Sequence, residues 1–204
     1  MRTDLRKTGE GPMNQNHDDR RRRRRRKRRA IAVVGFLFVA FGLAWFFESQ
    51  ATTTVVFIRY AELQNNGLSN PGLSAAGRRR AQELVRVIGD IDVVAGVDAI
   101  FANRYRNTQE TAEPLAKYLD LPIQVVDSKD IVGLTERILK DYKGKIVLVV
   151  TDREALPALI REMHGSKKVP PMADTEHDNL YIVSIPWYGK VKTLRLKYGA
   201  PYIP

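Results

Sequence analysis

Residues 145–165 read KIVLVVTDREALPALIREMHG. After Lys145, residues 146–150 form a continuous apolar and β-branched run, so residues 145–150 are typical of a strand buried on both faces of a sheet. Residues 154–164 have apolar side chains at helical spacing, and Gly165 is a common residue just beyond a helix end. A buried strand that leads directly into a helix is the building unit of an α/β fold.

The same alternation of strand and helix patterns covers the chain from residue 54 onward. Strands are predicted at residues 54–58, 98–101, 123–126, 145–150, 180–185 and 191–196. Helices are predicted at residues 73–88, 107–119, 131–141 and 154–164. Ser74 is a suitable N-cap for the first of these helices. Strands separated by helices of this length predict a three-layer α/β/α fold with a mostly parallel sheet over residues 54–204.

Three polar stretches follow predicted strands. Residues 59–62 (RYAE) follow the first strand, residues 103–107 (NRYRN) follow the second, and residues 151–154 (TDRE) follow the strand at 145–150. In a sheet of this kind, ligands bind beyond the carboxyl ends of the strands. We therefore expect these three stretches to border one crevice.

A basic block precedes an apolar stretch near the start of the chain. Residues 20–29 are all arginine except for one lysine, and residues 30–47 (AIAVVGFLFVAFGLAWFF) carry no charge. As a helix, the apolar stretch would be about 27 Å long, which is enough to cross the hydrocarbon core of a membrane. The sequence therefore predicts a disordered basic tail at residues 1–29, a transmembrane helix at 30–47 and a linker at 48–53.

The basic block also predicts the topology. Such a block resists translocation, so we expect a single-pass protein of the cell membrane with a cytoplasmic N-terminus and an extracytoplasmic domain, periplasmic if the host is bacterial. The tail is expected to contact anionic lipid. Two alternatives stay open. Residues 49–51 (SQA) resemble a signal-peptide cleavage site, and the apolar stretch could be a buried core helix, although its basic flank makes it poor core material.

The positive charge of the chain belongs to the tail. Residues 1–29 hold 13 basic and 4 acidic residues, whereas residues 48–204 hold 21 basic and 19 acidic residues. A nearly neutral domain argues against specific nucleic-acid binding. The chain has no cysteine, which excludes disulfides, a cysteine nucleophile and thiolate metal sites. We expect no metal and no cofactor.

Five stretches of the domain are similar to motifs of the histidine phosphatase superfamily, also called phosphoglycerate mutase-like. They are VVFIRYAE (55–62), LSNPGLSAAGRRRAQEL (68–84), DAIFANRYRNTQETAEPLA (98–116), KIVLVVTDREALPALI (145–160) and EHDNLYIVSI (176–185). They occur in the order and spacing of that family over about residues 53–199. The resemblance implies the α/β fold of the family and a phosphoryl-transfer site built around a nucleophilic histidine.

The catalytic positions implied by the resemblance hold other residues in this chain. Tyr60 stands at the position of the nucleophilic histidine, and Asp152 stands at that of the second histidine. Asn107 stands at the position of the second pocket arginine, with Arg106 one residue early. Only Arg59, which precedes the nucleophile position, is carried over from the family pattern.

These replacements predict a loss of phosphohydrolase activity. A tyrosine has a pKa of about 10 and is mostly protonated at neutral pH, so Tyr60 is a poor nucleophile. A carboxylate such as Asp152 repels a bound anion by about 4 kcal/mol at 4 Å and an effective dielectric constant of 20. We expect Asp152 to pair with Arg59 and to fill the former phosphate site.

The remaining polar residues near this position are predicted to line a remnant of the pocket or its rim. The predicted pocket remnant is Arg59, Arg106, Asn107 and Arg153. The predicted rim is Glu62, Arg104, His177 and Asn179. Among these, His177 is a candidate for a rescuing base or a metal ligand. Outside the pocket, His164 is expected at a helix end and residues 78–80 (RRR) on an exposed helix face.

Three functions are compatible with the sequence. The leading hypothesis is a membrane-anchored pseudoenzyme that acts as a binding or regulatory module for an unknown protein or a small anionic ligand. The alternative is a phosphatase with altered chemistry that uses Tyr60, or Asp152 with His177. A third is a structural role, in which the domain offers a partner surface and residues 1–29 act in the cytoplasm.

Overall fold

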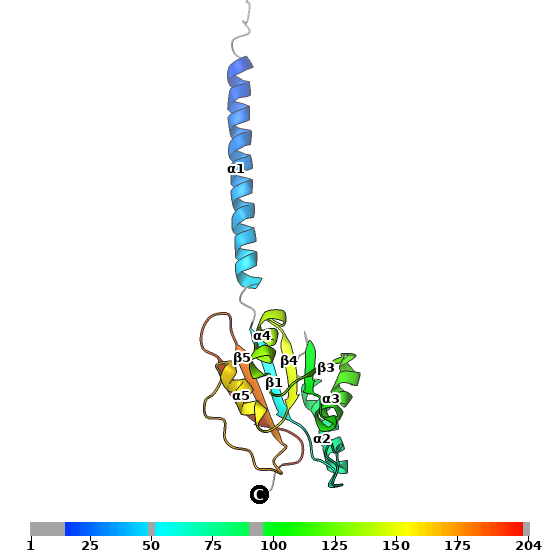
Figure 1. Cartoon of the computed structure of the whole chain (residues 1–204). Helices are drawn as coiled ribbons and strands as arrows, with labels where there is room; N and C mark the ends of the chain where they lie inside the picture. Colours follow the sequence, from blue (N-terminus) through cyan, green and yellow to red (C-terminus); the bar gives the residue numbers. More distant parts are fainter. Residues whose placement is uncertain (1–14, 49–51, 90–95, 202–204) are drawn as a thin grey trace, which may run out of the picture. The chain divides into compact units, whose positions relative to one another are not determined.

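The computed structural model describes residues 15–48, 52–89 and 96–201 of the 204-residue chain. The chain divides into two compact units, Met1–Ser49 and Gln50–Pro204 (Figure 1). The first unit holds one long helix, and the second holds a sheet with helices on both faces.

The long helix, α1, extends from Gln15 to Glu48. Its segment Arg26–Phe46 is long and apolar enough to cross a membrane, and all of its residues are exposed. The stretch for which a disordered tail was predicted is helical from Gln15 onward. Arginine and lysine are good helix formers, so the basic block continues the apolar helix. Residues 1–14 lie outside the described part.

The second unit is built on one six-stranded sheet of order β3-β2-β4-β1-β5-β6. The strands are β1 (Thr53–Arg59), β2 (Ala99–Asn103), β3 (Ile123–Val126), β4 (Ile146–Thr151), β5 (Asn179–Ile185) and β6 (Lys192–Lys197). The first four strands in the sheet order run parallel, whereas β5 is antiparallel to β1 and β6 is antiparallel to β5. The predicted mostly parallel sheet is therefore confirmed.

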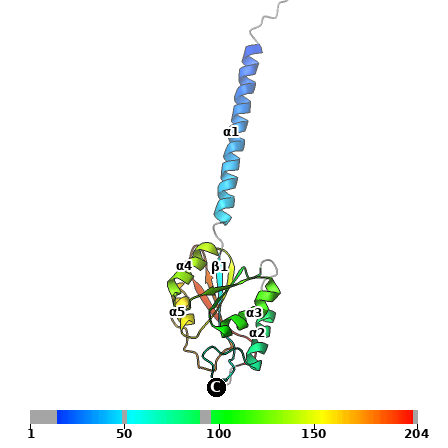
Figure 2. The same ribbon diagram turned by 45° about the vertical axis from the view of Figure 1, so that its right-hand side comes forward.

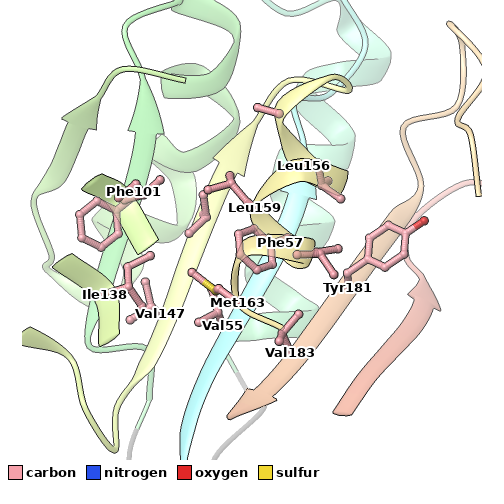
Figure 3. Packing of buried hydrophobic residues seen from close by; sticks show 14 of the residues in the cluster. Val55, Phe57, Phe101, Ile138, Val147, Leu156, Leu159, Met163, Tyr181 and Val183 are labelled. Atoms are coloured by element: carbon pink, nitrogen blue, oxygen red, sulfur yellow. The ribbon is translucent and has the colours of Figure 1, made fainter. Parts of the chain in front are cut away.

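Four helices cover the two faces of this sheet. They are α2 (Ala75–Ile88), α3 (Arg106–Leu119), α4 (Ile131–Asp141) and α5 (Ala155–Glu162). Figure 2 shows α4 and α5 on one side of the strands and α2 and α3 on the other. Along β1, Val55 and Phe57 pack toward α4 and α5 (Figure 3), whereas Val56 and Ile58 pack toward α2 and α3. This alternation of burial produces the predicted three layers.

The capping residues account for the helix boundaries. Ser74 caps α2, because its Oγ accepts a hydrogen bond from the Gly77 amide at 3.0 Å. α5 ends at Glu162, two residues earlier than predicted. His164 lies beyond that end with φ of 58°, so it forms the left-handed turn after the helix and is not its last helical residue.

Candidate functional site

The carboxyl ends of β1 and β4 lie next to each other at one edge of the sheet. Arg59 is paired with Thr151 in the parallel ladder, and the Tyr60 amide donates to the Thr151 carbonyl with N···O 3.1 Å. Tyr60 and Asp152 therefore follow two neighbouring strands. The structure brings together the two positions where the histidine phosphatase pattern has histidine.

The guanidinium of Arg59 is bound by the protein itself. Arg59 is only 5% exposed. Its Nη1 donates to the carbonyl oxygens of Ala173 (2.8 Å) and Glu176 (3.0 Å), and its Nη2 lies 3.5 Å from the Tyr60 hydroxyl. Its Nε is buried. The two carbonyls therefore occupy Nη1, whereas Nε keeps no acceptor among the described residues.

Asp152 does not pair with Arg59, so that prediction is wrong. Its Oδ1 accepts a hydrogen bond from the Ala155 amide at 2.7 Å, and its backbone carbonyl accepts from the Leu156 amide at 3.2 Å. The carboxylate therefore caps the first turn of α5, where the free amides and the helix dipole stabilise a negative charge. Arg59 donates to backbone carbonyls and not to the Asp152 carboxylate, which was its expected partner.

His177 lies beside Tyr60. The two ring centroids are 5.8 Å apart, and His177 Nδ1 lies 2.8 Å from the Tyr60 carbonyl oxygen. A carbonyl can only accept, so Nδ1 carries the proton and Nε2 is free of one in the neutral ring. Burial lowers the pKa of His177, and the nearby Arg59 cation lowers it further, although the bond to Tyr60 opposes this shift. The structure thus provides a neutral imidazole next to the phenol.

The loop that carries His177 is braced by its own polar contacts. Glu176 accepts from Lys197 Nζ at 2.7 Å and from Asn179 Nδ2 at 2.7 Å, and the bond from Lys197 is the main cause that lowers the pKa of Glu176. Lys197 also donates to Asp178 Oδ1 at 2.8 Å. Asn179, predicted at the rim, therefore holds the loop in place, and the loop in turn supplies the carbonyls that bind the arginine of the site.

The first turn of α3 holds the position of the second pocket arginine. Asn107 is buried there, and its Oδ1 has no donor among the described residues. Arg106 is exposed, and its Nε donates to Glu110 Oε1 at 2.5 Å. Glu110 also accepts from the Leu73 amide at 2.7 Å. Because Arg106 is neutralised on its own helix, it does not replace the missing cation.

Glu62, predicted at the rim, binds Arg80. Arg80 Nη2 donates to Glu62 Oε1 at 2.7 Å, and Arg80 Nε lies 3.0 Å from both carboxylate oxygens. Burial is the largest single influence and would raise the pKa of Glu62, but the hydrogen bond from Arg80, a backbone hydrogen bond and the charges of Arg80 and His177 together lower it. Arg80 is 6% exposed, so the prediction of an exposed face for residues 78–80 is wrong at this position.

Two further predicted residues also have partners of their own. Arg153 forms ion pairs with Asp174 and with Glu154, the second with Nη2···Oε1 3.0 Å. Arg104 is exposed, and its Cζ lies 5.9 Å from the centroid of the Tyr105 ring. Within the described residues, neither makes a hydrogen bond or ion pair with the residues that end β1 and β4. The surviving arginines therefore do not rebuild a phosphate cradle.

The side chains at this site support only a limited range of reactions. It combines a phenol, a buried imidazole, an arginine bound to carbonyls and a carboxylate that caps a helix. Within residues 15–48, 52–89 and 96–201, no group of three histidine, aspartate or glutamate side chains is placed to hold a metal ion. These parts provide a possible base at His177 but little positive charge for a phosphoryl group.

Sequence reasoning missed the contribution of Arg80 and of the Ala173 and Glu176 carbonyls. A signal for Arg80 was present, because residues 77, 80, 81, 84 and 88 share one helical face and the others are small or apolar. No local pattern marks the two carbonyls, since they come from a loop more than a hundred residues after Arg59.

Comparisons with known proteins support the fold assignment. No family model matches the sequence, and no curated protein matches it. Among solved structures, the protein histidine phosphatase SixA complexed with tungstate is 15% identical, with a TM-score of 0.56 over 71% of this chain and 96% of that chain. The mycobacterial glucosyl-3-phosphoglycerate phosphatase is 14% identical, with a TM-score of 0.54 over 73% of this chain and 99% of that chain.

A third neighbour extends the likeness to another phosphatase. The phosphoserine phosphatase from Entamoeba histolytica is 13% identical, with a TM-score of 0.50 over 72% of this chain and 97% of that chain. These structural neighbours are members of the histidine phosphatase superfamily. At this level of identity the likeness concerns the fold, and the C-terminal unit has the histidine phosphatase fold.

Proposed function

We propose that this protein is a membrane-anchored domain of the histidine phosphatase fold that does not hydrolyse phosphate esters and acts as a binding or regulatory module. One observation carries the proposal. The residues that follow β1 and β4 are Tyr60 and Asp152, and the Asp152 carboxylate is used to cap α5. The site thus offers a phenol and an engaged carboxylate in place of two imidazoles.

The chemistry of these groups supports the loss of activity. Attack on phosphorus needs a nucleophile that is unprotonated at working pH and cations that hold the phosphoryl oxygens. Tyr60 is a phenol, Asp152 adds negative charge, and Arg59 already donates to two carbonyls. One like-charge contact at 4 Å costs about 4 kcal/mol at an effective dielectric constant of 20, which corresponds to roughly a thousandfold weaker anion binding.

The anchor is the second part of the proposal. Arg26–Phe46 meets the length and hydropathy of a membrane span, and an almost uninterrupted arginine block precedes it. A block of this kind favours a cytoplasmic N-terminus and contact with anionic lipid, which would place the domain on the extracytoplasmic side, the periplasm in a bacterium. The ligand of the domain would be an unknown protein or a small anion, with no specific nucleic acid.

The test is hydrolysis of a generic aryl phosphate by the purified full-length chain. A triple variant, Tyr60→His with Asn107→Arg and Asp152→His, is assayed beside it. We expect the native chain to match the uncatalysed background and the triple variant to exceed it. Turnover by the native chain at the rate of an ordinary phosphatase would contradict the proposal.

A second candidate function is a phosphatase with altered chemistry. Its supporting observation is His177, a neutral imidazole whose Nδ1 is fixed on the Tyr60 carbonyl at 2.8 Å. If this candidate is correct, native turnover is present and His177→Ala abolishes it. His164→Ala, which changes an exposed histidine beyond α5, serves as the control and leaves such turnover intact.

A further inference from the structure

The strand register defines the end of the sheet at which β1 begins. Thr54 of β1 is paired with Ile146 of β4 and with Ser184 of β5, and Ser184 is paired with Lys192 of β6. These four residues form one row across the sheet. The residues just outside this row therefore lie at the same end, which is opposite to the end that carries Tyr60.

This end carries a set of exposed lysines, which we call the basic rim. The basic rim is Lys143, Lys145, Lys167, Lys168, Lys190 and Lys192. The amide of Ser166 donates to Thr193 Oγ1 at 2.9 Å, which places the two lysines that follow it beside β6. None of the six forms an ion pair with another described residue. The described carboxylates at this end are fewer, namely Asp98, Asp120, Asp141 and Glu162.

The β5–β6 hairpin adds two aromatic side chains at this end. Trp187 is 53% exposed and Tyr188 is 87% exposed. The register Thr53↔Ile185 places this hairpin directly beyond the first residue of β1. Exposed tryptophan and tyrosine next to lysine are the composition of a surface that contacts the interface of a membrane.

The linker between α1 and β1 is short. Only residues 49–52 separate the last residue of α1 from the first residue of β1. A fully extended chain of that length covers about 17 Å. If α1 spans a membrane, the end of the sheet that begins at Thr53 is therefore tethered near the bilayer surface, within about two Debye lengths at physiological ionic strength.

We propose that the basic rim, together with Trp187 and Tyr188, rests on the headgroups of anionic phospholipids in the leaflet from which α1 emerges. The inference rests on the membrane anchor of the proposed function. Among the described residues, six lysines against four carboxylates complement a negative lipid surface, and the two rings suit the headgroup layer. Docking in this way holds the Tyr60 end of the sheet away from the bilayer, where it is accessible to a partner.

The experiment uses the fluorescence of the hairpin in the full-length chain. The chain has two tryptophans, so Trp45→Phe leaves Trp187 as the sole tryptophan, whose fluorescence can be excited selectively over that of the tyrosines. This variant is reconstituted into vesicles of phosphatidylcholine with phosphatidylglycerol, or of phosphatidylcholine alone, each with a headgroup spin-labelled lipid as quencher. We expect Trp187 to be quenched in the anionic vesicles, with the quenching weakened in neutral vesicles and at high salt.

Charge reversal provides the matched comparison. In the Trp45→Phe background, Lys190→Glu with Lys192→Glu is expected to weaken the docking equilibrium about thirtyfold or more, given the typical contribution of one lysine at an anionic surface. Arg104→Glu with Lys129→Glu reverses two exposed charges that follow β2 and β3 at the opposite end of the sheet, and is expected to change nothing.

Vesicle flotation separates the two proposals. A chain that does not float with vesicles disproves the anchor and, with it, the docking that depends on it. A chain that floats but whose Trp187 is unquenched, or is quenched equally in neutral vesicles, disproves the docking alone. Shielding of Trp187 from acrylamide without quenching by lipid would indicate a protein or a second copy on this surface and would also overturn the inference.

Discussion

Asp152 is a capping residue in this protein. Its Oδ1 accepts from the Ala155 amide at 2.7 Å, and asparagine can make the same bond. We therefore expect Asp152→Asn to preserve the free energy of unfolding, and Asp152→Ala to reduce it by about 1 kcal/mol. Chemical denaturation of the two variants checks this. If asparagine is as destabilising as alanine, the negative charge matters more than the cap, and a partner for that charge has to be sought.

His177 makes the stability of the domain depend on pH. Burial holds its pKa below the value of about 6.5 expected in the unfolded chain, so the unfolded state binds more protons as the pH falls below that value. We expect the free energy of unfolding to decrease between pH 7 and pH 5, and the decrease to be smaller in His177→Gln. Denaturation at a series of pH values measures both slopes.

The control for this pH dependence is His164→Gln, which removes an exposed histidine and should leave the native slope unchanged. Carboxylates with lowered pKa, such as Glu62 and Glu176, contribute stability that is lost only as the pH falls below about 4.5, outside this window. A native slope that survives His177→Gln would show that another group causes the pH dependence and would contradict this prediction.

Side-chain partners were the hardest feature to predict from the sequence. The motif pattern identified Arg59, Tyr60 and Asp152 as neighbours, and the strand register confirms that the last two follow adjacent strands. The pattern did not reveal what each side chain binds. Two carbonyls from a distant loop satisfy the arginine, and a local amide satisfies the aspartate, because both are nearer than the expected ion-pair partner.

The packing of α2 depends on one glycine. A Cβ atom at Gly77 would lie 2.2 Å from the carbonyl oxygen of Glu62, which is backbone and cannot rotate away. Overpacking of this kind costs about 1–3 kcal/mol, more than the roughly 1 kcal/mol that alanine gains in a helix. We expect Gly77→Ala to lower the free energy of unfolding by about 1 kcal/mol or more. Chemical denaturation measures the change.

Gly96→Ala is the matched control for this substitution. A Cβ atom there would meet its nearest neighbour, in Leu119, at 3.9 Å, which is ordinary contact. We expect no loss of stability from it. A Gly77→Ala protein as stable as the native one would mean that the segment around Glu62 moves freely, and the Glu62–Arg80 ion pair would then not fix α2 to the site.

Helices and strands were predictable because their signals are local. Apolar periodicity, the Ser74 cap and the glycine after α5 gave the elements to within a few residues. The extent of α1 was not predicted, since a run of charged residues carries no apolar periodicity and its helix propensity was not weighed. Arg80 was misassigned for a related reason, because its charge was given more weight than its place on the buried face of α2.

The entire chain combines an apolar helix with a domain of known fold. Motif order predicted this fold although structural neighbours share only 13–15% of their residues with it. The order of the motifs identifies the fold even at this low sequence identity. Positions in strands and tight turns restrict the residue types that can occupy them more strongly than surface positions do. An activity does not follow from the fold, because it depends on a few side chains at the site.

Membrane anchoring of the full-length chain is directly testable. We expect the intact 23.2 kDa chain to remain in the membrane fraction of an expressing bacterium after an alkaline wash. Val34→Arg with Phe38→Arg should release it, because each arginine at the centre of a span costs about 3 kcal/mol, whereas Val34→Leu with Phe38→Leu should not. Recovery of a soluble, shorter chain that begins after residue 51 would instead identify a cleaved signal peptide.

The most direct test of a closed phosphate site is the binding of an oxyanion to the native protein. Isothermal titration of the full-length chain with tungstate, the anion in the SixA complex, reports on the site without any need for turnover. Because Arg59 is bound to carbonyls and Asp152 is a carboxylate, we predict no binding at millimolar concentration. Micromolar binding that is lost in Arg59→Gln and kept in Arg104→Gln would contradict this account.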